Sequence, residues 1–478
     1  MTSLADVNFS APARSGNGYD GGWKSHVSKT SPTMAASTGK RPVTDDDGSI
    51  GRDPLQRPDS ATHFGVNLAA LAVGLLILYL LSQLHPGAID ASVILITTCA
   101  SIAIIIVGGE RLWRGSSLII DAGLNLTNLR PLSIRHAATR VFGLVLTLGL
   151  IALTYWLFPE YHGDFYNPFW RFLRLLAPAV VPAALVYFLW SDSRLDEPDD
   201  AYWHLGRIAL GRGIDAGAPA MLREHFLGWT VKAFFLPLMV VYLTDQINGA
   251  PGLLADVAQN GLRNSWYQLL LRTAYTVDLL FCVVGYVMTV RLFDSHIRST
   301  EPTMLGWVVA LICYQPFYSV IGTYYLRYDE NGEWLDFFSA YPAFSGFWGG
   351  CIIALVILYG LATVAFGIRF SNLTHRGIIT SGPYRYTRHP AYLCKNLSWW
   401  LISVPFLTAA DFGTGLRHCC LLGLLNTVYF LRAKTEERHL SRDPVYVAYS
   451  EWITRHGIFS RMLRIVSVRR RRPDEKAT

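Results

Sequence analysis

The stretch 344-FSGFWGGCIIALVILYGLATVAFGI-368 holds 25 residues without one Asp, Glu, Lys or Arg. A helix rises about 1.5 Å per residue, so about 20 residues cross the hydrocarbon core of a bilayer. The run therefore predicts a membrane-spanning helix. The same prediction applies to seven earlier apolar runs, each with two charged residues at most: 64–84, 91–109, 141–158, 175–190, 226–244, 265–290 and 304–326.

Two shorter apolar runs follow, at 397–410 and 419–431, and predict a tight helical hairpin. The expected fold is an all-α, polytopic integral membrane helix bundle of about ten transmembrane helices. The composition agrees, because the 478 residues are 51% hydrophobic and only 16% charged, against roughly 25% charged in soluble proteins. This excludes a soluble enzyme and a disordered chain. Seven cysteines without a CxxC pair also argue against structural disulfides or a metal site.

Lys and Arg resist translocation and therefore mark cytoplasmic loops. Loops rich in Lys and Arg alternate along the chain with loops that have few. The four rich loops hold 15 of these residues, whereas the loops between them hold 4. The rich loops are 110–140, 191–225, 291–303 and 369–390. Both termini are therefore expected in the cytoplasm. We divide the chain into four parts. Residues 1–63 are expected to form a polar, disordered cytoplasmic tail, and residues 64–343 a transmembrane bundle of seven helices. Residues 344–462 form a motif-rich helical region, and residues 463–478 a basic cytoplasmic tail. Arg469–Arg472 predict contact with anionic lipid headgroups, and no motif indicates nucleic-acid binding.

The chemistry-bearing stretch begins after the eighth run and reads RGIITSGPYRYTRHPAYLCKNLSWW, from Arg376 to Trp400. Gly382-Pro383 predicts a turn, and Pro390 suits the first turn of a new helix. Arg388 and His389 are therefore expected at a helix N-terminus near the membrane surface, where free backbone N–H groups favour a carboxylate. The alternative is an ordinary basic and aromatic membrane border.

A second stretch follows the hairpin and contains Arg432, Glu436 and Glu437. Arg432 and Glu436 are four residues apart, so they share one face of a helix. Acidic residues just outside a membrane helix are either simply solvated or bind the hydroxyl or amine groups of a ligand.

Together the two stretches resemble the isoprenylcysteine carboxyl methyltransferase family over about residues 345–462. The family pattern is a Gly-x-Tyr turn, Arg-His-Pro-x-Tyr, a membrane hairpin, Glu-Glu-x-x-Leu and Tyr-x-x-Tyr. This chain has Gly382-Pro383-Tyr384, Arg388-His389-Pro390-Ala391-Tyr392, Glu436-Glu437-Arg438-His439-Leu440 and Tyr446-Val447-Ala448-Tyr449. One position departs from the pattern, because Cys394 stands where the family usually has glycine.

The resemblance implies a methyltransferase that uses S-adenosyl-L-methionine and makes 344–462 the catalytic region. Arg432 matches the arginine near the substrate carboxylate, and we expect it to be catalytic together with Arg388. The positions that match cofactor contacts are Arg376, Gly377, Ile378, Ile379, Tyr384, His389, Pro390, Ala391, Tyr392 and Glu436.

Methyl transfer from a sulfonium to a carboxylate needs alignment and exclusion of water more than a strong base. One arginine can hold one carboxylate oxygen while the other attacks. The family analogy points to an isoprenylcysteine-like or other lipid carboxylate. The alternatives are a phospholipid amine, whose lost proton needs a base such as His389 or Glu437, an NADPH-dependent reductase similar to sterol reductases, and a transporter or scaffold.

Two features of the membrane runs carry expectations of their own. Asp278 lies in the middle of the run 265–290, where acids are costly; we expect an ion pair with Lys232 or Arg272, the alternative being contact with a substrate headgroup. Pro316 predicts a kink in the run 304–326.

Overall fold

The computed structural model describes residues 56–83, 89–115, 117–127, 129–329, 332–407 and 411–462. The predicted basic tail 463–478 and most of the N-terminal tail, 1–55, lie outside the described residues. Within these ranges, seven helices are long and apolar enough to cross a membrane. They are α1 (Phe64–Gln83), α2 (Ala91–Arg114), α4 (Ile134–Leu157), α5 (Asn167–Asp192), α7 (Ala218–Asn260), α8 (Leu262–Val287) and α12 (Pro342–Phe366). The all-α membrane architecture is confirmed.

The remaining described elements are short, apart from one long helix. The helices are α3 (Ser117–Asp121), α6 (Ala201–Ala209), α9 (Met304–Leu311), α10 (Phe317–Tyr324), α11 (Trp334–Phe338), α13 (Pro390–Ser403), α14 (Phe412–Leu440) and α15 (Pro444–His456). The 3₁₀ turns are η1 (Pro159–His162), η2 (Asp164–Tyr166), η3 (Arg291–Phe293), η4 (Gly367–Arg369) and η5 (Gly382–Arg385). Two strands, β1 (Ser299–Thr300) and β2 (Thr374–His375), pair antiparallel.

One predicted membrane helix is not continuous. The run 304–326 forms α9 and α10, with residues 312–316 between them outside any helix. Pro316 has no N–H to donate and its ring clashes with the preceding turn, which ends a helix rather than only bending it. The expected count of ten spans is therefore not confirmed.

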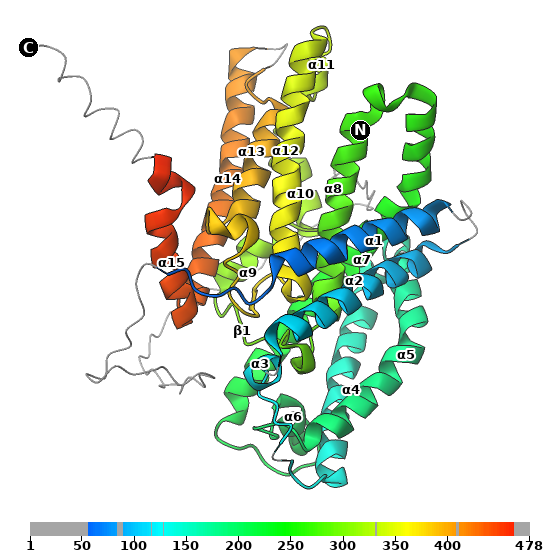
Figure 1. Ribbon diagram of the computed structural model, residues 1–478, viewed down its shortest axis with the longest axis vertical. Helices are drawn as coiled ribbons and strands as arrows, with labels where there is room; N and C mark the ends of the chain where they lie inside the picture. The colour runs from blue at the N-terminus through cyan, green and yellow to red at the C-terminus, as the bar shows by residue number, and fades with distance from the viewer. Residues whose placement is uncertain are drawn as a thin grey trace, which may run out of the picture.

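The predicted hairpin is formed by α13 and α14. Pro390 lies at the first position of α13, as expected, and Asp411 caps α14 by accepting a hydrogen bond from the Thr414 backbone N–H. Because α14 continues for 29 residues, it carries both Arg432 and Glu436 on one helix. In Figure 1, α12, α13 and α14 run side by side, and α15 turns back beside the lower end of α14.

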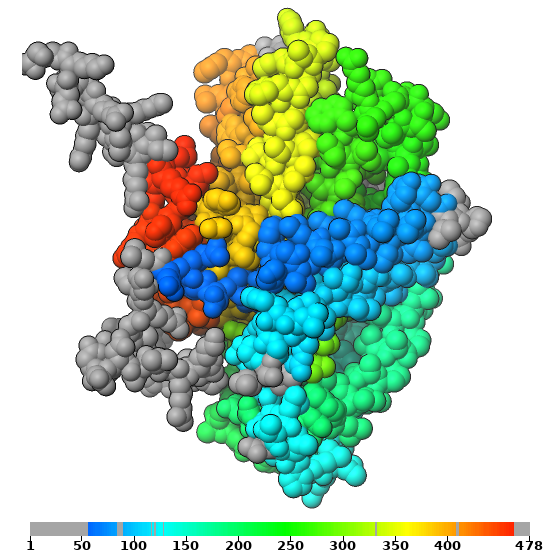
Figure 2. All heavy atoms as spheres, in the orientation of Figure 1, coloured from blue at the N-terminus to red at the C-terminus, as the bar shows by residue number. Residues whose placement is uncertain are grey.

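The main hydrophobic core joins the N-terminal helices to the centre of the molecule. Its fully buried side chains come from α2, α7 and α8 and include Leu95, Ile102, Phe235, Leu280 and Phe281. Helix α1 packs against both α2 and α12, and it crosses the face of the molecule shown in Figures 1 and 2 between the α12–α14 group and α4. The N-terminal bundle thus contacts the predicted catalytic region directly.

The strand pair β1–β2 positions two loops for the site. Ser299 pairs with His375 and Thr300 pairs with Thr374. The loop after α8 is thereby held against the loop after α12. As a result, Glu301 reaches a cavity otherwise built mainly from the C-terminal region.

Candidate active site

A cavity lies where the loop after α12 meets α13, α14 and α15. Its volume is about 150 Å³. All the predicted site residues line it except Pro390, which is buried at the start of α13. The lining predicted residues are Arg376, Gly377, Ile378, Ile379, Tyr384, Arg388, His389, Ala391, Tyr392, Arg432 and Glu436.

Arg432 is 7% exposed and projects from α14 among aromatic rings. Its guanidinium carbon lies 5.2 Å from the ring centroid of Tyr392, 5.7 Å from that of Tyr314 and 5.9 Å from that of Tyr429. In the described part of the chain, no carboxylate lies within ion-pair distance of it. A buried guanidinium without an anion is ready to bind one from outside.

Asn372, which no motif indicated, orients this arginine. Its Oδ1 accepts a hydrogen bond from Arg432 Nη2 across 2.5 Å, while its side-chain amide donates to the hydroxyls of Tyr286 and Tyr314. Asparagine suits the place because its amide accepts on one side and donates on the other. An aspartate there would neutralise the cation instead.

Glu436 faces the same cavity one turn further along α14, as the i,i+4 spacing predicts. Its Oε2 accepts a hydrogen bond from the hydroxyl of Tyr392 at 2.9 Å. The Tyr392 ring in turn stacks on His389, with centroids 5.5 Å apart. Residues of the two motifs are therefore in direct contact, although more than 40 positions separate them.

Arg376 supports the loop rather than aiming its charge at the cavity. Its five N–H donors bind five backbone carbonyls, those of Gly285, Met288, Ser295, Ile368 and Phe370. Burial, together with the nearby positive charge of Arg369, lowers the pKa of Arg376 to about 9. All N–H donors of the Arg376 side chain are therefore used within the protein. If Arg376 contacts a ligand as predicted, it does so through its backbone.

The neighbouring Gly377 sits in a tight backbone position. Its φ is +113°, and a Cβ there would approach Ala61 Cβ to 2.7 Å. The Ala61 N–H donates to Ile378 O at 2.9 Å, and Thr380 Oγ1 donates to Pro58 O at 2.8 Å. Residues 58–61, which the sequence analysis assigned to the N-terminal tail, therefore hydrogen-bond to the predicted cofactor-binding loop.

The two tyrosines of the Tyr-x-x-Tyr pattern close the cavity from α15. Tyr449 donates to the carbonyl of Tyr384 at 2.7 Å and so fixes the turn η5. Tyr446 and Tyr449 pack with Ile378 and Ile379 in one buried apolar cluster. This cluster forms a dry wall beside the polar groups.

Arg388 and His389 are held by neighbouring side and main chains. Arg388 Nη2 donates to Ser450 O at 2.8 Å and to Thr454 Oγ1 at 2.6 Å, which ties α15 to the start of α13. His389 Nε2 lies 3.1 Å from Glu437 Oε1, and this hydrogen bond lowers the pKa of Glu437 to about 2. Glu437 does not line the cavity.

Several buried polar atoms of the lining have no hydrogen-bond partner among the described residues. They are Glu301 Oε2, Thr374 Oγ1, His375 Nε2, Arg388 Nε and Tyr446 OH. Two of them are in ion-pair contacts, because His375 Nε2 lies 3.3 Å from Asp443 Oδ2 and Glu301 Oε2 lies 4.0 Å from His439 Nδ1. Burial lowers the pKa of His375 to about 4, so its ring is neutral near pH 7. Buried polar groups normally find partners, so the remaining atoms, on Thr374, Arg388 and Tyr446, indicate a polar ligand. Sequence spacing could not indicate Glu301 or His375, because the short β1–β2 pair alone brings them together.

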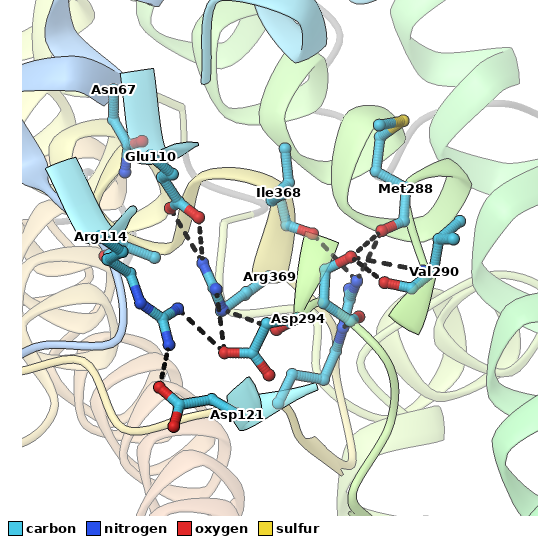
Figure 3. Close-up of polar contacts among 12 residues, drawn as sticks. Asn67, Glu110, Arg114, Asp121, Met288, Val290, Asp294, Ile368 and Arg369 are labelled. Atoms are coloured by element: carbon cyan, nitrogen blue, oxygen red, sulfur yellow. Dashed lines mark hydrogen bonds and ion pairs between the residues drawn. The ribbon is translucent and has the colours of Figure 1, made fainter. Parts of the chain in front are cut away.

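A buried ion-pair network lies beside the cavity (Figure 3). Arg369 Nη1 is 2.9 and 2.8 Å from the two carboxylate oxygens of Glu110, and Asp294 Oδ2 is 2.9 Å from Arg114 Nη1. Burial alone would raise the pKa of Asp294, but the guanidiniums of Arg369, Arg298 and Arg114 bring it below its ordinary value. The network links α2 to η4 and thus connects the N-terminal bundle to the cavity wall.

Asp278 does not form the expected ion pair. Its carboxylate accepts hydrogen bonds from the Tyr359 hydroxyl at 2.6 Å and the Thr363 hydroxyl at 2.5 Å, both on α12. Among the described residues it has no ion-pair partner; Lys232 instead lies over the ring of Trp229. Two hydroxyl groups from the adjacent helix stabilise this carboxylate instead of a cation. Burying them costs less desolvation free energy than burying a second charged group.

No curated protein and no solved structure gives a significant match to the chain. One family model does match, and its segment contains the loop after α12, α13 and all of α14. Together with the seven membrane-competent helices, this supports a membrane methyltransferase. The C-terminal part of the chain, residues 349–442, matches the isoprenylcysteine carboxyl methyltransferase (ICMT) family.

Proposed function

We propose that this protein transfers a methyl group from S-adenosyl-L-methionine to a carboxylate of an amphiphilic substrate, such as an isoprenylcysteine or another lipid acid. The single observation that carries the proposal is Arg432: a buried guanidinium, oriented by Asn372, inside a cavity and without an ion-pair partner in the described part of the chain. Such a group binds a carboxylate strongly through charge-assisted hydrogen bonds.

The residues of the cavity fit the cofactor as well. Glu436 keeps one carboxylate oxygen beyond its bond to Tyr392, and it suits hydroxyl or ammonium donors. The Tyr446 hydroxyl, which has no hydrogen-bond partner among the described residues, adds a polar group to the cavity. Glu301 and His375 also line it and contact His439 and Asp443. Ile378 and Ile379 supply an apolar wall. When bound, S-adenosylmethionine supplies a methyl group activated by its sulfonium.

The reaction balances without a catalytic base. A new C–O bond forms between the methyl carbon and a carboxylate oxygen while the C–S bond breaks, so the products are a neutral methyl ester and a neutral thioether. No proton is released. Arg432 holds the second carboxylate oxygen and fixes the line of attack, and the tyrosines around it exclude water.

The substrate is proposed to be amphiphilic because the cavity lies against membrane-type helices. Exposed apolar side chains on α12–α14 include Ile357, Leu358, Leu397, Leu424 and Phe430, and they suit acyl or prenyl chains. We propose 344–462 as the catalytic region, 64–343 as a supporting bundle that contributes Glu301 and Tyr314 to the cavity, and the cytoplasm as the side that the cavity faces.

The test is a binding experiment followed by turnover. Purified protein in lipid nanodiscs is titrated with S-adenosylmethionine and, separately, with NADPH. The proposal predicts saturable binding of the first and transfer of labelled methyl groups into a base-labile ester of a farnesylated cysteine. Binding of NADPH alone would support the reductase alternative and contradict the proposal.

A further inference from the structure

Lys395 is a second, partly buried cation of the cavity, and no motif or family position assigned it a role. It lies on α13 three residues after Tyr392 and lines the cavity together with Arg432. Its ammonium nitrogen is 5.5 Å from the ring centroid of Tyr359, 5.3 Å from that of Trp399 and 5.7 Å from that of Tyr429. Three aromatic rings therefore surround the lysine head.

Within the described ranges, no carboxylate lies within ion-pair distance of this lysine and no hydrogen bond of its Nζ is found. Asp278 acts on Lys395 through its charge but lies beyond ion-pair distance, and its two oxygens already accept hydrogen bonds from the hydroxyls of Tyr359 and Thr363. A charged group that is partly withdrawn from water is stabilised by an anion that binds beside it. Aromatic faces alone supply only part of what the ammonium loses on leaving water.

The two cations lie against the same aromatic ring. Lys395 Nζ and Arg432 Cζ lie 5.7 and 5.9 Å from the same Tyr429 centroid, so they are no further apart than these two distances combined. Both border one cavity, and neither has a carboxylate partner within the described residues. This part of the cavity is therefore strongly favourable for an anion.

The same geometry disfavours a cation. A cluster of two tyrosines and a tryptophan is the usual binding site for an ammonium or quaternary ammonium headgroup. Here Lys395 places its own ammonium in that cluster. A phospholipid amine would have to displace the lysine and approach two like charges, which is the repulsive element that specificity commonly requires.

We propose that Lys395 is a specificity-determining residue that selects anionic acceptors and rejects amine headgroups. This inference rests on the proposed function and adds to it the charge of the acceptor. Lys395 completes, with Arg432, a two-cation subsite that binds an acceptor carboxylate and its adjacent polar groups.

The experiment measures binding separately from turnover. Wild type, Lys395→Met and Lys395→Arg are titrated with a farnesylated cysteine carrying a free carboxylate and with its neutral methyl ester. Lys232→Met is the matched control, because Lys232 is also a partly buried lysine on a membrane helix and lies over an indole ring but does not line the cavity. S-adenosylmethionine binding and thermal unfolding are measured for each variant.

Wild type, Lys395→Arg and the Lys232→Met control are expected to bind the carboxylate roughly tenfold or more tightly than the ester. Lys395→Met is expected to lose most of that preference, to keep its affinity for S-adenosylmethionine, and to gain binding of a choline-type headgroup. An unchanged carboxylate preference in Lys395→Met would overturn the inference. Absence of S-adenosylmethionine binding in the wild type would instead overturn the proposed function.

Discussion

Asn372 Oδ1 and Arg432 Nη2 are joined by a hydrogen bond of 2.5 Å that connects the loop after α12 to α14. The asparagine amide is itself fixed by the hydroxyls of Tyr286 and Tyr314. The direction of the Arg432 guanidinium is thus set by a neutral residue, which leaves the positive charge available to a ligand.

Replacing Asn372 tests this relationship. Asn372→Ala frees the guanidinium and is expected to lower turnover, because the acceptor is then less well aligned. Asn372→Asp, although closer in size, is expected to be the less active of the two, since its carboxylate pairs with Arg432 and competes with the acceptor. Steady-state kinetics should show a raised acceptor KM for Asn372→Asp. An Asn372→Asp enzyme as active as the wild type would contradict this role.

Arg432→Ala removes the proposed acceptor contact. Turnover is expected to fall roughly 10²–10³-fold, the usual cost of losing one group that stabilises the transition state, while S-adenosylmethionine affinity changes little. The control is Arg417→Ala, which alters an exposed arginine 15 residues earlier on α14, about 22 Å away at the helical rise. Equal losses in both variants would point to a general effect on α14.

Glu436→Gln should weaken cofactor binding more than it lowers the turnover rate at saturating cofactor. Losing a charged acceptor costs roughly tenfold or more in affinity. Glu437→Gln is the matched control, because this adjacent residue pairs with His389 and Lys434 and does not line the cavity. Calorimetry with S-adenosylmethionine should separate the two variants; a weaker complex for Glu437→Gln than for Glu436→Gln would reverse the assignment.

Glu437 makes stability depend on pH in the acid range. The hydrogen bond from His389 lowers its pKa from 4.5 to about 2 in the folded protein. The unfolded chain therefore takes up this proton first as the pH falls, so the stabilisation is complete above about pH 4.5 and is lost toward pH 2. Thermal unfolding midpoints should fall less steeply with acidification in Glu437→Gln than in the wild type. Parallel curves would exclude this contribution.

The side chains of Glu110 and Arg369 are both 0% exposed. We expect that removing one of them destabilises the protein more than removing both. Removing one partner, as in Glu110→Leu or Arg369→Met, leaves a buried charge and is expected to cost roughly 3–5 kcal/mol. The double variant Glu110→Leu with Arg369→Met should recover much of that loss. Thermal unfolding of the four proteins forms a double-mutant cycle, and additive losses would show that the two residues act independently.

The fold was largely predictable, because an uncharged run of more than about 18 residues can satisfy its backbone in a membrane only as a helix. The prediction of one continuous helix was wrong for the run 304–326. Pro316 interrupts the helix there, and the average hydropathy of the run contains no information about this break. The contact of residues 58–61 with the loop at 377–380 also had no signal, because its hydrogen bonds are made by backbone groups and by the hydroxyls of Ser60 and Thr380, which form no recognisable motif.

The candidate site was predictable where its residues are contiguous. Arg432 and Glu436 share a helix face, as their spacing indicated, and both line the cavity. Arg376 also lines it, but its donors are consumed by carbonyls, which no sequence motif identifies. Asn372 and Lys395 were not foreseen, since each depends on side chains brought together only by the packing of α8, α12, α13 and α14.

The central claim is that a carboxylate held by Arg432 receives the methyl group. The most direct measurement incubates nanodisc-embedded protein with methyl-labelled S-adenosylmethionine and a mixture of farnesylated cysteine and phosphatidylethanolamine, followed by mass spectrometry. The account predicts label in a base-labile methyl ester, absent from the lipid amine and strongly reduced in Arg432→Ala. Label on the amine nitrogen, or ester formation unaffected by Arg432→Ala, would contradict it.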